Sequence, residues 1–140
     1  MIYVDTNIFI YAIENHPEYG NACKKILLGI ESEKLEATAS MLVLIEILNV
    51  LSKINKVLKK SGKKELDVKK NIEAIISLPI TWIEINFFII KKAADYKYQI
   101  MPADYIHLAT MESNSVAEII SADTEFDKVK SIHRIDPLKY

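Results

Sequence analysis

Short apolar runs alternate along this chain with longer segments in which apolar residues recur every three or four positions. The short runs are rich in β-branched residues, which favours strands, and the longer segments have the period of amphipathic helices. This alternation predicts an α/β fold built on a parallel sheet. The expected strands are Ile2–Val4, Glu36–Thr38, Ile80–Glu84, Glu118–Ser121 and His133–Ile135. The expected helices are about Ile8–Glu14, Glu18–Glu31, Met41–Lys60, Val68–Leu78, Phe87–Tyr98 and Ala103–Ser113.

Several of these boundaries have a local physical reason. Pro17 suits a first helical turn, where its missing N–H would be unpaired in any case. Asp67 and Asn86 are suitable N-caps, because their side chains can accept hydrogen bonds from free N–H groups of the next turn. Pro79 is expected to end the helix before it.

The chain has 140 residues, half of them hydrophobic, which is the size of one compact domain covering residues 1–140. Its formal charge of −1 gives no global attraction to nucleic acid or to an anionic membrane. Any site for a polyanion must therefore be local.

The remaining composition points to the cytoplasm. The single cysteine, Cys23, lies on an apolar helical stripe, which predicts a packed thiol and a reducing compartment. The N-terminus has no basic segment followed by an apolar one, as a signal peptide would. The most apolar window, Met41 to Leu51, is interrupted by Glu46 and Asn49 and is shorter than a membrane span of about 18 residues. We expect no membrane partner.

Four carboxylates border apolar segments. Asp5 and Asp123 each follow a predicted strand, Glu46 lies inside an apolar helix, and Asp104 follows Pro102. Parallel strands place their carboxyl ends at one edge of a sheet, so Asp5 and Asp123 can share one crevice there. Clustered carboxylates repel one another unless a cation neutralises them, and oxygen ligands suit Mg²⁺ or Mn²⁺.

Each carboxylate also has a structural explanation. Asp5 can cap a helix, with Thr6 and Asn7 orienting it, and Asp104 can interact with a helix dipole. Glu46 can belong to a solvated stripe with Asn49 and Lys53. Asp127 can cap a helix or assist the site through a water. His107 is expected to be a core or helix-face histidine outside the site.

A second feature is a lysine-rich segment between Lys53 and Lys70, which holds eight lysines against Glu65 and Asp67. The segment is either a solvated tip between two helices or a surface that binds RNA phosphates. The residues predicted to bind RNA are Lys59, Lys60, Lys63 and Lys64.

Together these motifs resemble the PIN domain family of metal-dependent ribonucleases, particularly the VapC-type toxins of toxin–antitoxin pairs. The resemblance runs over the whole chain. It rests on the opening Ile2 to Asn7 with its Asp-Thr-Asn, the helical Glu46, the segment Pro102 to Ala109, and the segment Ser121 to Asp127. Ser121 stands where the family often has Thr.

The resemblance implies an α/β/α sandwich whose five-stranded parallel sheet has the order 3-2-1-4-5. It places Asp5, Glu46, Asp104 and Asp123 on the metal-binding and catalytic positions, with Thr6 or Asn7 as support and Asp127 on a less uniform acidic position. It also implies Mg²⁺ or Mn²⁺ as cofactor, an RNA substrate, an antitoxin partner and a homodimer. One metal-bound water would attack the phosphodiester in line.

Three other functions compete with a toxin ribonuclease. A phosphohydrolase that forms an aspartyl-phosphate usually needs a second acid two residues after the first, and position 7 is Asn. A PIN-like scaffold that binds RNA or protein without cleavage would not need intact acidic positions. A PIN nuclease of RNA processing shares the same chemistry, so its distinction from a toxin lies in its target RNA and neighbouring gene.

Overall fold

The structure is a computed structural model that describes residues 1–140. Five strands form one parallel sheet in the order β3-β2-β1-β4-β5. This confirms the predicted fold class and strand order. The strands are β1 (Ile2–Val4), β2 (Ala37–Ser40), β3 (Ile80–Ile83), β4 (Glu118–Ile120) and β5 (His133–Ile135).

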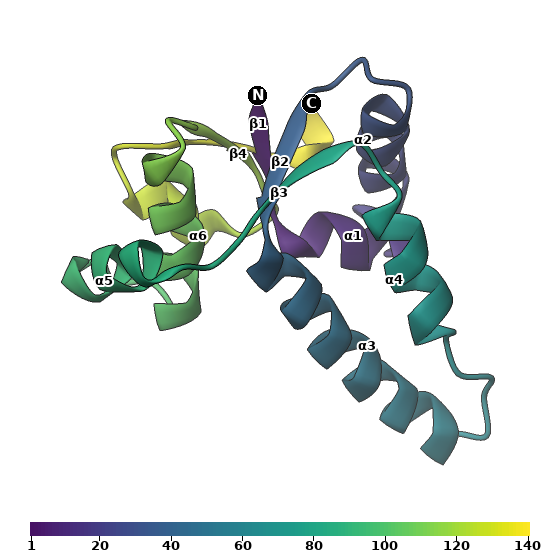
Figure 1. The fold of residues 1–140 in the computed structure, drawn as a ribbon. Coiled ribbons are helices and arrows are strands. Elements are labelled where there is room, and N and C mark those ends of the chain that lie inside the picture. Colours follow the sequence, from purple (N-terminus) through teal and green to yellow (C-terminus); the bar gives the residue numbers. More distant parts are fainter.

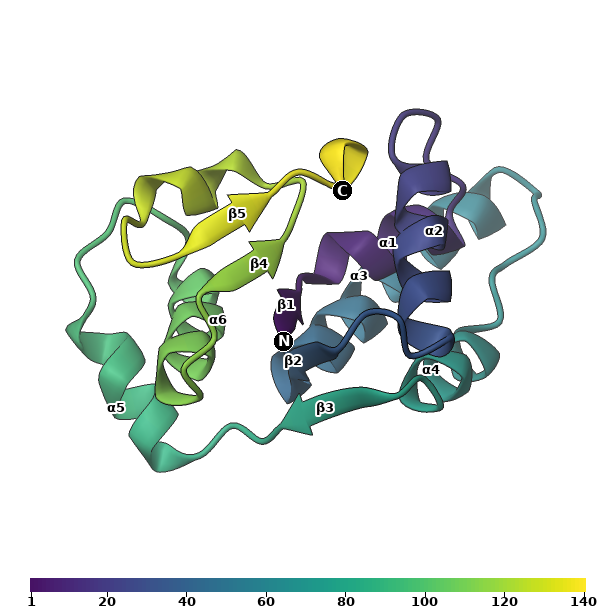
Figure 2. The same ribbon diagram turned by 90° about the horizontal axis from the view of Figure 1, so that it is seen from above.

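Helices cover both faces of the sheet (Figures 1 and 2). One side carries α1, α2 and α4, and the other carries α5 and α6, whereas α3 extends away from the end of β2. The helices are α1 (Thr6–Ile13), α2 (Gly20–Glu31), α3 (Met41–Lys60), α4 (Val68–Ile76), α5 (Phe87–Asp95) and α6 (Pro102–Ser113), with 3-10 turns η1 (Thr124–Lys128) and η2 (Pro137–Lys139). None of the helices is both long enough and apolar enough to cross a bilayer.

The alternation of side chains along the strands divides the core between the two faces. Ile2 and Val4 pack into the large cluster beneath α1, α2 and α3, whereas Tyr3 between them packs with residues of α6. All three are buried, as expected for a strand covered on both sides. Cys23 lies in the large cluster, and burial raises the pKa of its thiol to about 11, which fits a packed thiol.

The start of α2 lies two residues after its predicted position. The helix begins at Gly20, and Pro17 lies in the preceding turn. His16 holds this turn, because its Nδ1 accepts hydrogen bonds from the backbone N–H groups of Glu18 and Tyr19, each at 3.1 Å. A Cβ on Gly20 would lie 3.0 Å from the carbonyl carbon of Asn15, so the close approach of the two segments favours glycine at this position.

Other boundaries moved by one to three residues, and α3 matched its prediction. The N-caps Asp67 and Asn86 are confirmed, since each side chain accepts a backbone hydrogen bond from the next turn. Helix α5 ends at Asp95 rather than Tyr98, because Tyr96 takes an extended backbone conformation. Helix α4 ends at Ile76, three residues before Pro79.

Two backbone hydrogen bonds continue the sheet beyond the ends of the central strands. The N–H of Asp5 donates to Ile120 O at 3.1 Å, and the N–H of Ser121 donates to Ile135 O at 3.2 Å. The residues directly after β1 and β4 are therefore held side by side at the carboxyl edge of the sheet.

Candidate active site

A cleft of about 420 Å³ opens at the carboxyl edge of the sheet. All four carboxylates predicted to form one site line it, and they come from four separate elements of the chain. The complete lining is Asp5, Thr6, Asn7, Ile10, Tyr11, Glu14, Glu46, Val50, Ile54, Asp104 and Asp123. The structure thus brings together the four predicted carboxylates, Thr6 and Asn7, and it adds Glu14, which was not predicted. The third predicted supporting residue, Asp127, is not in the lining.

Asp5 is the most firmly held of the four carboxylates. Its Oδ1 accepts the N–H of Thr6 at 2.8 Å, which is the N-cap of α1. Its Oδ2 accepts the Asn7 amide at 3.0 Å and the Ser121 hydroxyl at 2.5 Å. Burial raises the pKa of Asp5, and the nearby His107 and these donors oppose that rise. Asp5 therefore both caps α1 and lines the cleft.

Glu46 is held through a single oxygen. Its Oε1 accepts the Thr6 hydroxyl at 2.8 Å and contacts His107 Nε2 at 2.5 Å, whereas Oε2 has no hydrogen bond to the protein. Burial raises the pKa of Glu46, but the hydrogen bonds from His107 and Thr6 outweigh it and lower the pKa overall. Glu46 is therefore an ordered carboxylate, and the solvated-stripe interpretation does not describe it.

Asp104 lies in the first turn of α6 and has no hydrogen bond to its side chain. Its burial and the nearby charges of Asp5 and Asp123 raise its pKa to about 7. Asp123 is better compensated, since its Oδ1 accepts the N–H of Glu125 at 2.9 Å at the start of η1. The repulsion in the cleft therefore falls mainly on Asp104.

Asp127 does not line the cleft. Both of its carboxylate oxygens accept hydrogen bonds from the Arg134 guanidinium, at 2.8 and 3.1 Å. Arg134 also donates to Ser121 O at 2.8 Å, so the pair ties η1 to the ends of β4 and β5. Asp127 was predicted to support the site. Its contacts instead hold the neighbouring strand ends together.

Three residues next to the cleft were missed from the sequence. His107 is fully buried and links Glu46 to the hydroxyl of Tyr3, and Ser121 links Asp5 to Asn7. An i+3 spacing places His107 beside Asp104 on one face of α6, a signal that could have identified the histidine. No comparable signal marks Tyr3, which reads as an ordinary strand residue.

The lining fits a divalent cation in its donor chemistry and charge. Five carboxylates line one cleft, the four predicted ones and Glu14, and the burial and neighbouring charges that raise the pKa of Asp104 favour a compensating cation there. No three acidic, histidine or cysteine side chains are grouped closely enough to coordinate an ion as they stand. The fit therefore lies in the donor set rather than in a preformed coordination geometry.

The PIN domain family model matches residues 2–132, and the chain belongs to this family. Solved structures share its fold over nearly the whole of both chains. A toxin–antitoxin complex from Klebsiella pneumoniae has a TM-score of 0.65 at 20% identity, covering 98% of each chain. VapBC2 from Rickettsia felis, bound to a DNA fragment from its promoter, has a TM-score of 0.66 at 17% identity, covering 96% of this chain and 98% of that one.

A third similar structure is Mycobacterium tuberculosis VapC20, described as a toxin that cleaves the sarcin–ricin loop. Its TM-score is 0.65 at 13% identity, covering 93% of this chain and 95% of that one. Among proteins of curated function, none matches the sequence.

Proposed function

We propose that this protein is a metal-dependent endoribonuclease, the toxin of a toxin–antitoxin pair, which hydrolyses RNA phosphodiesters in the cytoplasm. The observation that carries the proposal is the single cleft lined by Asp5, Glu46, Asp104 and Asp123 in a chain of the PIN family. The toxin–antitoxin complexes among proteins of the same fold support the toxin assignment.

In this proposal the four carboxylates hold Mg²⁺ or Mn²⁺, with Thr6 and Asn7 as support. The cation would supply charge neutralisation and a more acidic bound water. Asp5 serves as the fixed central residue, because donors from three residues already restrain both of its oxygens. Asp104 and Glu46 would complete the ligand shell or orient the bound water.

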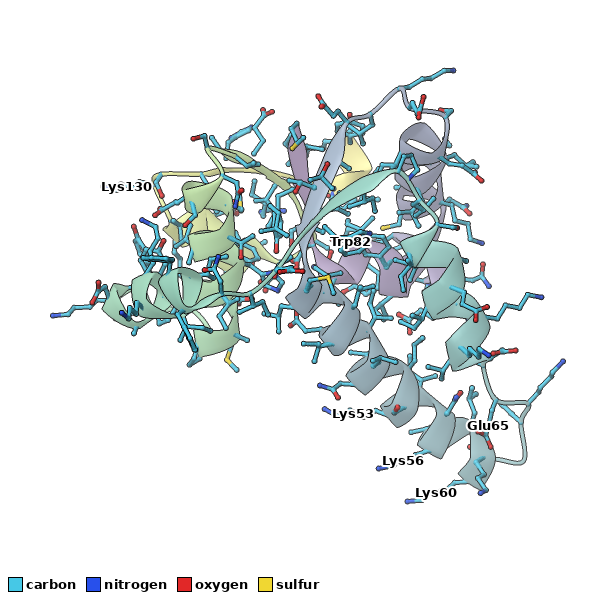
Figure 3. All side chains as sticks on the ribbon, in the orientation of Figure 1. Lys53, Lys56, Lys60, Glu65, Trp82 and Lys130 are labelled. Atoms are coloured by element: carbon cyan, nitrogen blue, oxygen red, sulfur yellow. The ribbon has the colours of Figure 1, made fainter.

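The RNA contact is proposed to follow α3. Lys53 and Lys60 lie seven and fourteen residues after Glu46, so all three share nearly one helical face, with steps of about 10 Å between them. Figure 3 shows Lys53, Lys56 and Lys60 projecting from α3 on the side away from α4. All three are exposed and none has an ion pair.

Within the predicted RNA-binding set, the proposed path along α3 favours the lysines of the helix over those of the loop. Lys60 and Lys59 belong to the last turn of α3, whereas Lys63 and Lys64 lie in the loop that follows, beyond Gly62. Gly62 has a φ of 67°, which turns the chain back toward α4. The loop lysines therefore lie outside the helical face that carries Lys53 and Lys60.

The proposed protein partners are an antitoxin and a second copy of the chain. Exposed apolar side chains support a protein contact, since Phe87 is 84% and Phe88 is 81% exposed at the start of α5. On α3, Met41, Ile45 and Leu48 form an exposed apolar stripe at helical spacing. A small reading frame directly upstream, encoding an antitoxin, would distinguish a toxin from an RNA-processing nuclease.

The chemistry is tested by comparing wild type, Asp5→Asn and the matched variant Asp95→Asn on structured RNAs. Asp95 is exposed at the end of α5 and makes no hydrogen bond or ion pair through its side chain. We expect cleavage with Mg²⁺ or Mn²⁺ by wild type and Asp95→Asn, and a loss of at least about 100-fold in Asp5→Asn. Cleavage that survives in Asp5→Asn, or with a chelator, would contradict the proposal.

A further inference from the structure

A chain of buried hydrogen bonds leads from the sheet to Glu46. The backbone N–H of Ser40 donates to the Tyr3 hydroxyl at 3.1 Å, and that hydroxyl lies 2.5 Å from His107 Nδ1. On the other side of the ring, His107 Nε2 lies 2.5 Å from Glu46 Oε1. Tyr3, Ser40 and His107 are each fully buried, so the chain is shielded from water until it reaches the cleft.

The direction of the last contact follows from chemistry. Glu46 has a lowered pKa and is ionised at neutral pH, so its oxygens can only accept hydrogen bonds. His107 Nε2 must therefore carry a hydrogen, whether the imidazole is neutral or charged. The Tyr3 hydroxyl restrains the opposite nitrogen, which prevents the ring from flipping its nitrogens away from Glu46.

The same contacts divide the two oxygens of Glu46 between different environments. Thr6 and His107 both bind Oε1, and Oε2 has no protein partner although the side chain lines the cleft. A glutamate on a helix has three rotatable bonds, so holding one oxygen from two sides selects one arrangement out of many.

We propose that Tyr3 and His107 are positioning residues, forming a buried relay from Ser40 that fixes Glu46 Oε1 and thereby presents Oε2 to the cleft. This inference rests on the proposed function, since it assigns the relay to the binding of a divalent cation. Neither residue touches the cation or the RNA in this assignment. Both act through Glu46, much as outer hydrogen-bond partners orient ligands in metal sites.

The test measures Mn²⁺ affinity by calorimetry in purified, metal-free protein. His107→Leu removes the donor to Glu46, and we expect it to weaken Mn²⁺ binding by about 10–100-fold. Tyr3→Phe keeps the ring and removes only the hydroxyl, so it should weaken binding in the same direction but less. His107→Gln retains an amide donor and should recover part of the affinity.

The matched control is Tyr96→Phe. It also removes a tyrosine hydroxyl bonded to a carboxylate, Glu112 at 2.6 Å, but between α5 and α6 and outside the cleft lining. Its Mn²⁺ affinity should equal that of wild type. Circular dichroism of every variant shows whether a loss of affinity comes from loss of the fold.

A second measurement needs no metal. In protein labelled with ¹⁵N-histidine, the Nε2-bound hydrogen of His107 should give a resonance protected from exchange with water, in wild type and in Tyr96→Phe. Tyr3→Phe should speed its exchange, because the ring loses its restraint. If this hydrogen exchanges with water at the same rate in Tyr3→Phe as in wild type, the role of Tyr3 is overturned.

The outcomes separate this inference from the proposed function. If Glu46→Gln loses Mn²⁺ binding while His107→Leu and Tyr3→Phe bind like wild type, the relay has no positioning role and the metal site stands. If wild-type protein binds no Mn²⁺, the proposed metal site is wrong, and so is the assignment of the relay to cation binding. The His107 resonance still shows in that case whether the hydrogen-bond chain exists.

Discussion

Among the four carboxylates of the predicted site, Asp104 is the one that no hydrogen-bond donor contacts. Burial and the neighbouring charges of Asp5 and Asp123 raise its pKa to about 7, so its ionised form is disfavoured in the folded protein. In the unfolded chain the carboxyl ionises at its ordinary pKa near 4. Its ionisation therefore destabilises the fold progressively as the pH rises from about 4 to 7, and fully above 7.

We expect Asp104→Asn to raise the Tm of the metal-free protein, because the amide has no charge to bury. The increase should be on the order of 2–5 °C at pH 8, after allowing for partial exposure to solvent, and smaller at pH 5. Thermal melts in chelator at the two pH values check this. An equal or lower Tm in the variant at pH 8 would show that the charge of Asp104 is already compensated.

At this scale, sequence reasoning located four of the five carboxylates that line the cleft, all but Glu14, and misjudged the surroundings of two residues. Asp127 has the right type and spacing for a supporting acid, yet Arg134 from the next strand binds it away from the cleft. His107 was assigned to the core, and it is buried there, but its link to Glu46 joins residues 61 positions apart. Such contacts depend on side-chain packing that periodicity does not reveal.

Helix α3 carries both a carboxylate of the cleft and the lysines proposed to bind RNA. Its first turns carry Glu46 into the cleft, and its later turns carry exposed lysines away from it. The sequence predicted both ends of this helix, because its apolar residues keep a helical period over twenty residues and the lysine-rich loop that follows interrupts the pattern. The short strands were less certain at their ends, since three or four residues contain little periodic information.

The lysine face of α3 gives an expectation for RNA binding. Replacing Lys53 and Lys60 by Gln should reduce the salt dependence of single-stranded RNA binding by about 1.4 in log–log slope, if each lysine contacts one phosphate. Binding is measured in chelator, so that the RNA stays intact. Replacing Lys69 and Lys70 on α4 removes the same charge and should leave the slope unchanged. Equal slopes in all three proteins would contradict a path along α3.

At the scale of the whole molecule, exposed apolar side chains occur on several helices, including α2, α3, α4 and α5. Phe87 and Phe88 stand next to each other at the start of α5 with most of their surface in solvent. Burial of such rings in a contact between two copies would remove several kcal/mol of unfavourable hydration, at about 25 cal/mol per Å². This is the physical basis for the proposed homodimer.

We expect Phe87→Ser with Phe88→Ser to shift the protein toward monomer, as measured by light scattering over a range of concentrations. Val57→Ser is the control, because Val57 is also exposed, at 65%, but lies on the outer part of α3. A molar mass that is the same for the double variant and wild type at every concentration would exclude the phenylalanine pair from the contact.

The hydrogen bonds that continue the sheet beyond β1 and β4 have one more consequence. The amide of Asp5 is paired with Ile120 and that of Ser121 with Ile135, so the floor of the cleft belongs to the same cooperative unit as the central strands. Moving Asp5 out of place would break a hydrogen bond that continues the central sheet. We therefore expect an inhibitor of this protein to fill or cover the cleft rather than to displace the backbone beneath it.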